Sequence, residues 1–214
     1  MALQAFEKLS EPERSRILSA CVAEFTAHGY GQASTNNIVK QLGIPKGSLF
    51  YWFGSKDGLY LYLVDRAMKR FVEVFATAAR DWPNEILARY RILIASSLAF
   101  LEQNPDHYRL VMTFMDGEAR HLLGPYMQEH WQEGLSVWAN WFAGVDVSDF
   151  RTSPEEVHRL LMWVLAGIKL EMYAMVDRQN PVGTAHPQFM EHIDMVIRLL
   201  SHSIYHHPER WGYA

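Results

Sequence analysis

Residues 34–56 contain three lysines and no aspartate or glutamate, so every charged side chain within this stretch is cationic. Such ammonium groups neutralise the phosphates of a nucleic-acid backbone, and these contacts supply most of the non-specific affinity for DNA. The charge is local: residues 1–56 carry a net charge of +2, whereas residues 57–214 carry 14 basic and 20 acidic residues, a net of −6. We therefore expect phosphate binding only in a small N-terminal part of an acidic chain.

The same stretch has the pattern of two short helices joined by a tight turn, over residues 35–53. Ser34 or Thr35 can cap the first helix, and Gly43 allows the left-handed backbone that the turn needs. The second helix begins with small and polar residues, among which Gly47 would let the backbone come close to a ligand. In helix-turn-helix proteins the amino-terminal end of the second helix enters the major groove of DNA.

Residues 33–59, ASTNNIVKQLGIPKGSLFYWFGSKDGL, resemble the DNA-binding signature of the TetR family of transcriptional regulators. That signature has a capping Thr, a Gly-Val-Ser turn, a Gly-Thr-Leu-Tyr-x-His-Phe recognition helix and a Ser-Lys-x-x-Leu start to the next helix. The close resemblance covers residues 14–64, roughly a quarter of the chain. Phe50 replaces the usual tyrosine, and Trp52 stands where histidine or tyrosine is common, although its indole N–H can still donate to a phosphate.

The resemblance implies a role for each matching residue. Thr35 would cap its helix and bind a phosphate, and Lys56 would hold a second phosphate at the start of the next helix, where the dipole favours an anion. The other polar residues would reach base edges or nearby phosphates. The expected DNA contacts are Thr35, Asn36, Lys46, Gly47, Ser48, Tyr51, Trp52 and Lys56.

Nearly the whole chain is predicted to be helical, because apolar residues recur with a period of 3.6 and no stretch alternates for long with a period of two. We expect one helix from after Ser10 to residue 28, and a fray of the tail at 206–214 unless Trp211 and Tyr213 pack on the body. Further helices are expected at residues 85–103, 105–118, 125–142, 154–177 and 187–205.

The predicted fold is all-α, with an N-terminal three-helix helix-turn-helix DNA-binding domain at residues 1–56. A long connecting helix, residues 56–80, leads to a C-terminal helical domain at residues 81–214. The resemblance implies that this second domain binds an effector and dimerises. Its helices at 154–177 and 187–205 would form a four-helix bundle with a second copy, and a two-fold homodimer predicts a palindromic operator.

Tryptophan and methionine are concentrated after residue 84. Such residues usually form the core, but they also suit an adaptable apolar pocket, and the resemblance implies one between these helices. A small effector, expected to be apolar, would shift the population toward a state that releases DNA, as in a repressor. A buried Glu171 or Lys169 would need a partner that the effector could supply. The candidate pocket residues are Phe75, Phe100, Met112, Trp131, Trp138, Trp163 and Glu171.

Composition excludes other classes of protein. Hydrophobic residues make up 49%, enough for a sizeable core, and Cys21 is the single cysteine, which fits a reducing cytoplasmic setting. We expect no signal peptide at the start of the chain, and the apolar runs at 92–101 and 160–168 are shorter than the ~20 residues that span a bilayer. We expect a soluble cytoplasmic protein with DNA, a small effector and a second copy as partners, no cofactor and no membrane.

Two alternatives stay open. An enzyme is disfavoured, because the chain has no Gly-rich phosphate loop after a strand, no His-Glu-x-x-His and no Gly-x-Ser-x-Gly. His202 and His206, four residues apart, could share a metal, although two ligands make a weak site. The second alternative is a helical DNA-binding or protein-interaction module without a small-molecule effector, which a filled C-terminal core would favour.

Overall fold

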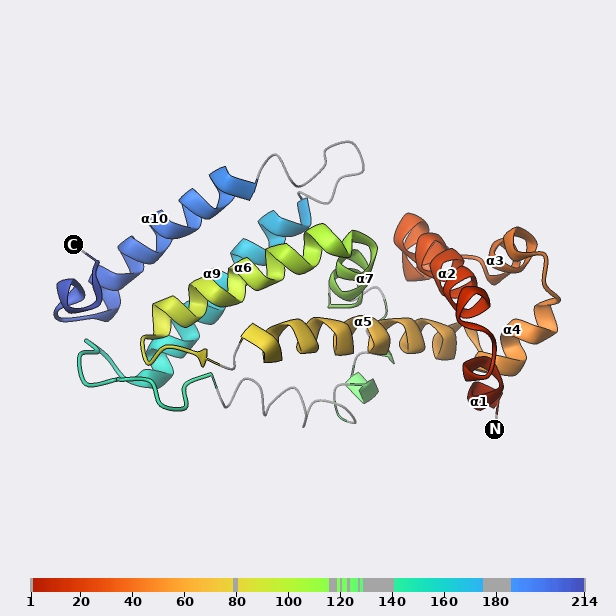
Figure 1. The fold of residues 1–214 in the computed structure, drawn as a ribbon, viewed down its shortest axis with the longest axis horizontal. Helices are drawn as coiled ribbons and strands as arrows, with labels where there is room; N and C mark the ends of the chain where they lie inside the picture. Colours follow the sequence, from red (N-terminus) through yellow and green to blue (C-terminus); the bar gives the residue numbers. More distant parts are fainter. Residues whose placement is uncertain are drawn as a thin grey trace. The chain divides into compact units, whose positions relative to one another are not determined.

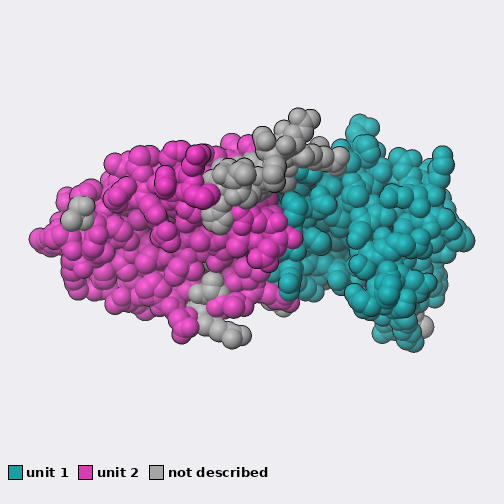
Figure 2. Space-filling view, turned by 45° about the horizontal axis from the view of Figure 1, so that its top comes forward, with its two compact units in different colours: residues 1–71, 104–132 teal, residues 72–103, 133–214 magenta. Residues whose placement is uncertain are grey.

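The computed structural model describes residues 2–78, 81–115, 119, 121–122, 124–126, 128, 141–174 and 186–213. Within these ranges all the regular elements are helices (Figure 1). There is no β-strand in them, only an isolated bridge between Phe150 and Tyr205. The predicted all-α class is confirmed. The chain forms two compact units, coloured separately in Figure 2: Met1–Phe71 with Asn104–Gln132, and Val72–Gln103 with Glu133–Ala214. The predicted domain limits at residues 56 and 81 stay a prediction.

The first unit is built around α2, which packs on α3 and on α7. Ser10 is the N-cap of α2, and its backbone N–H and hydroxyl both donate to the Glu13 carboxylate, at 3.4 and 2.7 Å. Gly29, at φ 67°, kinks the helix where a stop was predicted, and helical residues continue to Gln32. The helices of this unit are α1 (Ala2–Glu7), α2 (Glu11–Gln32), α3 (Thr35–Leu42), α4 (Lys46–Phe53), the start of α5 (Lys56–Ala78) and α7 (Pro105–Met115).

The second unit contains the end of α5 and a helical body in which α10 packs on α6. Its helices are α6 (Ile86–Gln103), α9 (Pro154–Ala174), α10 (His186–Ile204) and the 3-10 helix η3 (Pro208–Trp211). These agree with the predicted helices at 85–103, 154–177 and 187–205. Of the helix predicted at 125–142, residues 125, 126 and 128 are helical, residues 141 and 142 are not, and the rest lie outside the described residues.

Buried polar groups fix the C-terminal tail in the second unit. The Glu85 carboxylate caps α6 by accepting the N–H groups of Leu87 and Ala88, at 2.8 and 2.5 Å, and it also accepts the hydroxyls of Tyr205 and Tyr213. Each of these hydrogen bonds satisfies a polar group that burial would otherwise penalise. The predicted fray of the tail is therefore wrong.

A second anchor of the tail lies beside the first. The Asp149 carboxylate accepts the backbone N–H of His207 at 3.2 Å and the indole N–H of Trp211 at 3.3 Å. The structure thus shows the alternative to the predicted fray, in which Trp211 and Tyr213 pack on the body. Among the described residues no helix is both long and apolar enough to cross a membrane.

Candidate nucleic-acid interface

The turn between α3 and α4 has the geometry that its sequence predicts. Gly43 ends α3 in the left-handed region at φ 67°, and its N–H donates to the Lys40 carbonyl oxygen at 3.3 Å. The next residue, Ile44, donates to the Val39 carbonyl oxygen at 3.2 Å. These two bonds satisfy carbonyl groups at the end of α3 and direct the chain into α4 within three residues.

The cap of α3 is Ser34, so the cap that the resemblance assigned to Thr35 is wrong. Ser34 has extended backbone angles, φ −117° and ψ 113°, and its hydroxyl accepts the N–H of Asn37 at 3.4 Å. Thr35 already has helical geometry and lies at the first position of α3. It is half-buried, whereas Asn36 beside it is exposed.

One side of α4 is buried and the other is open. Leu49 and Phe53 are buried, at 2% and 8% exposure, and they hold the helix on the unit. Lys46 and Gly47 at its start are exposed, and Tyr51 is 60% exposed, an unusual state for a large aromatic side chain. With the half-buried Ser48 and Trp52, five of the predicted contacts thus share one short helix.

Lys56 is held at the first turn of α5. Its Nζ lies 4.9 Å from the centroid of the Tyr30 ring and donates to the Gly31 carbonyl oxygen at 3.2 Å. Tyr30 in turn donates its hydroxyl to Asp57, and burial together with this hydrogen bond raises the pKa of Tyr30 to about 12. The Lys56 ammonium and the positive end of the α5 dipole would both favour a phosphate at this place.

Trp52 has a more internal position than the other predicted contacts. It is half-buried, and its ring centroid lies 5.5 Å from that of Phe6 in α1. The residue therefore packs between α4 and the N-terminal helix. Its role as a DNA contact stays a prediction.

Sequence reasoning missed three residues that hold helices α3 and α4 in place. Glu24 of α2 accepts the backbone N–H of Ser34 at 2.8 Å and the side-chain amide of Asn37 at 3.3 Å. Arg16, also in α2, donates to the carbonyl oxygen of Leu42 at 3.1 Å. Phe6 lies in α1, a helix that was not predicted at all. The helical periodicity of α2 could not reveal Glu24 and Arg16, because their partners lie outside that helix.

The candidate effector residues fall in different places. Phe75 and Phe100 are buried in the second unit, at 6% and 1% exposure, and Met112 is buried in the first, at 9%. Trp163 is 70% exposed on α9, and Glu171 is exposed on the same helix, so neither lies in the interior of the single chain. Trp131 and Trp138 lie outside the described residues.

Metal chemistry finds no support in the described part of the chain. No group of three or more His, Cys, Asp or Glu side chains there is placed to hold an ion. His202 and His206 are both exposed. Two short helices with an open, cationic second helix instead define a helix-turn-helix DNA-binding domain.

Comparisons with known proteins agree with this class. Residues 17–63 match the sequence profile described as "Bacterial regulatory proteins, tetR family". A fatty acid metabolism regulator protein of Bacillus subtilis is 24% identical over 109 residues, 51% of this chain and 55% of that protein. The HTH-type transcriptional regulator LmrA of the same organism is 42% identical over 60 residues, 28% of this chain and 31% of that protein.

A solved structure shows that the fold is shared well beyond the matched domain. A TetR-family transcriptional regulator from Chloroflexus aurantiacus J-10-FL superposes with a TM-score of 0.66 at 19% identity, covering 94% of this chain and 97% of that one. The matches to the two curated relatives span about half or less of the length of those proteins. Together the profile match over residues 17–63, the relatives and the shared fold support a TetR-family transcriptional regulator.

Proposed function

We propose that the protein is a homodimeric repressor that binds a palindromic operator and is released from it by a small apolar effector. The observation that carries the DNA-binding part is the open face of α4, where Lys46, Gly47 and Tyr51 are exposed on a helix anchored by buried Leu49 and Phe53. A helix that is rigid on one side and polar on the other can enter a major groove without rearrangement.

The dimer is supported by apolar side chains on the surface of the second unit. Trp163 and Leu170, two turns apart on α9, are 70% and 68% exposed. Leu199 and Met195, one turn apart on α10, are 64% and 46% exposed. Large apolar residues at helical spacing on two helices are typical of an interface, and a two-fold axis would bury both stripes against their copies.

The effector class is proposed from the buried aromatic residues of the second unit and from one relative. Phe75 and Phe100 are apolar and buried, and the relative from Bacillus subtilis is named a fatty acid metabolism regulator. Long-chain fatty acids and their acyl thioesters are therefore the first ligands to test.

Selection from a random duplex library, followed by titration, tests the proposal. We expect the purified protein to enrich an inverted repeat, to bind it with strong salt dependence, and to release it when an acyl ligand is added. Absence of any salt-sensitive binding to duplex DNA would contradict DNA binding. Operator binding that no apolar ligand alters would instead favour a DNA-binding module without an effector.

A further inference from the structure

We propose that α1 braces the recognition helix, and that Phe6 is the residue that positions α4 for reading DNA. The inference rests on the proposed operator binding and adds a positioning role for a segment outside the matched residues 17–63. α1 packs directly on α4. It is the part of the chain that sequence reasoning left without structure.

Phe6 is completely buried and lies among three aromatic rings. Its ring centroid is 5.5 Å from that of Trp52, 4.9 Å from Phe53 and 5.8 Å from Tyr62. The contacts with Phe53 and Trp52 are tilted, and the contact with Tyr62 is edge-to-face at 87°, which are favourable arrangements for aromatic pairs. One side chain therefore joins the end of α4 to the side of α5.

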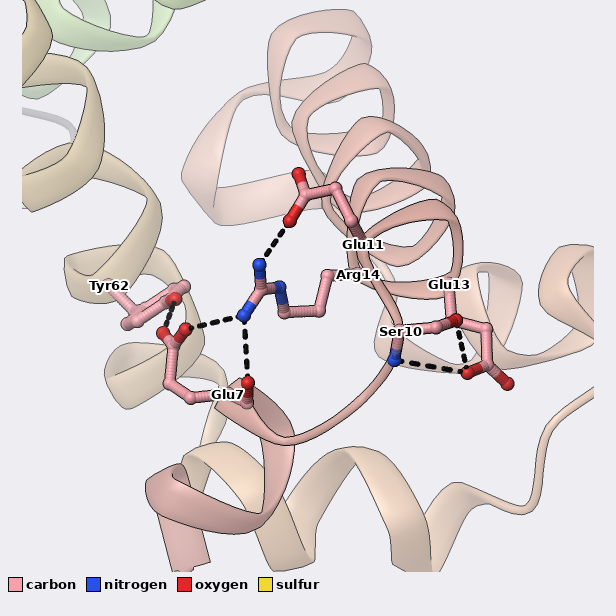
Figure 3. A network of polar contacts seen from close by, with 6 residues as sticks. All are labelled: Glu7, Ser10, Glu11, Glu13, Arg14 and Tyr62. Atoms are coloured by element: carbon pink, nitrogen blue, oxygen red, sulfur yellow. Dashed lines mark hydrogen bonds and ion pairs between the residues drawn. The ribbon is translucent and has the colours of Figure 1, made fainter.

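Polar contacts tie the same short helix to α2 and α5 (Figure 3). The Glu7 carboxylate accepts the hydroxyl of Tyr62 in α5 and also a guanidinium N–H of Arg14 in α2, at 3.3 Å. The same Arg14 nitrogen donates to the Glu7 carbonyl oxygen at 2.7 Å, and the guanidinium also donates to Glu11. The brace is thus anchored at its carboxyl end on two helices that do not belong to the recognition element.

α4 needs such support because it is only eight residues long. A helix of that length is unstable alone, and packing must fix its direction. Leu49 and Phe53 anchor the buried face of α4. Phe6 packs on the face of α4 that carries Trp52. Base readout requires side chains to be placed within about 0.5 Å, so a helix that can rock loses discrimination between sequences.

The charge of residues 1–7 argues for a positioning role of α1 and against a direct contact of its side chains with DNA. Residues 1–7 contain no lysine or arginine, and their charged side chain is Glu7. A direct phosphate contact from these side chains is therefore disfavoured. Loss of the brace should lower the ratio of operator to random-sequence affinity, while the salt dependence that the lysines create stays unchanged.

The test compares Phe6→Ala with Leu3→Ala, which removes a side chain 42% exposed on the same helix. We expect Phe6→Ala to lower the operator-to-random affinity ratio by about tenfold or more, with an unchanged salt slope on random duplex. Amide hydrogen exchange in α4 should accelerate. Leu3→Ala should match the unmodified protein in all three measurements, and Phe6→Leu should recover part of the ratio.

Two results would overturn the brace. One is a folded, dimeric Phe6→Ala variant with an unchanged affinity ratio and unchanged exchange in α4. The other is an equal loss of operator and random-duplex affinity, which indicates fewer folded molecules rather than a misplaced helix. If Phe6→Ala does not fold, the smaller change in Phe6→Leu decides between the same outcomes.

Failure of the proposed function is distinguishable from failure of the brace. If the unmodified protein enriches no duplex, operator binding is wrong. The brace is then tested by exchange alone, where acceleration in α4 by Phe6→Ala and not by Leu3→Ala supports it and equal exchange contradicts it.

Discussion

The ammonium group of Lys56 lies over the ring of Tyr30, with Nζ 4.9 Å from the ring centroid. The two residues lie at the start of α5 and near the end of α2, and the carbonyl oxygen of Gly31 accepts from the same ammonium at 3.2 Å. The side chain is therefore held in one place before DNA arrives. A cation fixed in this way loses less rotamer freedom when it binds a phosphate than a free surface lysine does.

Replacement of this lysine tests the phosphate contact. Lys56→Met should weaken binding to operator and random duplex alike, and it should reduce the salt slope by about one, because one fewer counterion is released. Lys69→Met is the matched control: it removes the same charge from the same helix, roughly 20 Å further along. Affinity titrations at several salt concentrations measure both slopes, and equal slopes for the two variants would contradict the contact.

The exposed apolar residues of α9 and α10 predict that a charge placed among them weakens the dimer. Leu199→Glu places a charge at a position that is 64% exposed in the single chain and buried in the proposed dimer. We expect the dissociation constant of the dimer to rise by at least about a hundredfold, since an unpaired buried charge costs several kcal/mol. Val147→Glu, 42% exposed in a loop of the same unit, should leave it unchanged. Analytical ultracentrifugation measures the constant, and a dimeric Leu199→Glu variant would place the interface elsewhere.

Much of the DNA-binding element could be predicted because its signals are local. Gly43 marks the turn and Ser55 caps α5, where its hydroxyl accepts the N–H of Gly58 at 3.0 Å. Helices α7 and α9 begin at Pro105 and Pro154, the residues at which their predicted ranges begin, and proline is favoured in the first turn of a helix. Such signals act between residues within four positions of one another, so a single sequence shows them.

The rest depends on contacts between residues far apart in sequence. α1 exists because Phe6 finds Trp52 and Tyr62, which lie 46 and 56 residues further along the chain. The tail is ordered because Tyr213 finds Glu85, 128 residues away. A six-residue helix and a polar tail carry no periodic pattern of their own, and tertiary packing decides their structure.

Two phenols of the first unit predict how stability depends on pH. Burial, with hydrogen bonds to Asp57 and Glu7, raises the pKa of Tyr30 and of Tyr62 from 10.0 to about 12. Each phenol stays protonated in the folded chain where it ionises in the unfolded one. Its contribution is therefore fully present below pH 10 and is lost as the pH rises towards about 12.

Tyr62→Phe removes one of these titrations. Between about pH 9 and about pH 12 the unfolding midpoint of this variant should fall less steeply than that of the unmodified protein. Tyr51→Phe, which alters a side chain 60% exposed on α4, should follow the unmodified curve. Thermal unfolding followed by circular dichroism gives the three curves, and parallel curves for all three proteins would show that the Tyr62 hydroxyl is not coupled to folding.

The buried carboxylate of Glu85 predicts a large change in stability. Glu85→Ala leaves the hydroxyls of Tyr205 and Tyr213 and two N–H groups of α6 without their acceptor. Each unsatisfied buried group costs about 1–3 kcal/mol, so we expect the free energy of unfolding to fall by about 3 kcal/mol or more. Glu85→Gln keeps an acceptor oxygen and should lose about half as much. Chemical denaturation measures the free energy of unfolding of both variants, and Glu191→Ala, which alters an exposed carboxylate, is the control. A loss below about 1 kcal/mol for Glu85→Ala would contradict the structural role of this carboxylate.

Two glycines of the DNA-binding element predict opposite outcomes for the same change. A Cβ at Gly58 would lie 2.1 Å from the carbonyl oxygen of Phe53, a backbone atom that cannot rotate away. A Cβ at Gly47 would meet nothing within 4 Å. Gly58→Ala must therefore shift the junction of α4 and α5, whereas Gly47→Ala fits the chain as it stands.

We expect Gly58→Ala to destabilise the first unit by about 1–3 kcal/mol, which lowers the unfolding midpoint by several degrees. Gly47→Ala should leave that midpoint within about a degree of the unmodified protein or raise it, because alanine favours a helix. It should nevertheless lower operator affinity, since the added methyl group stands where the backbone approaches DNA. Calorimetry and operator titration on the two variants separate the effects. Full operator affinity in Gly47→Ala would show that this glycine is not part of the interface.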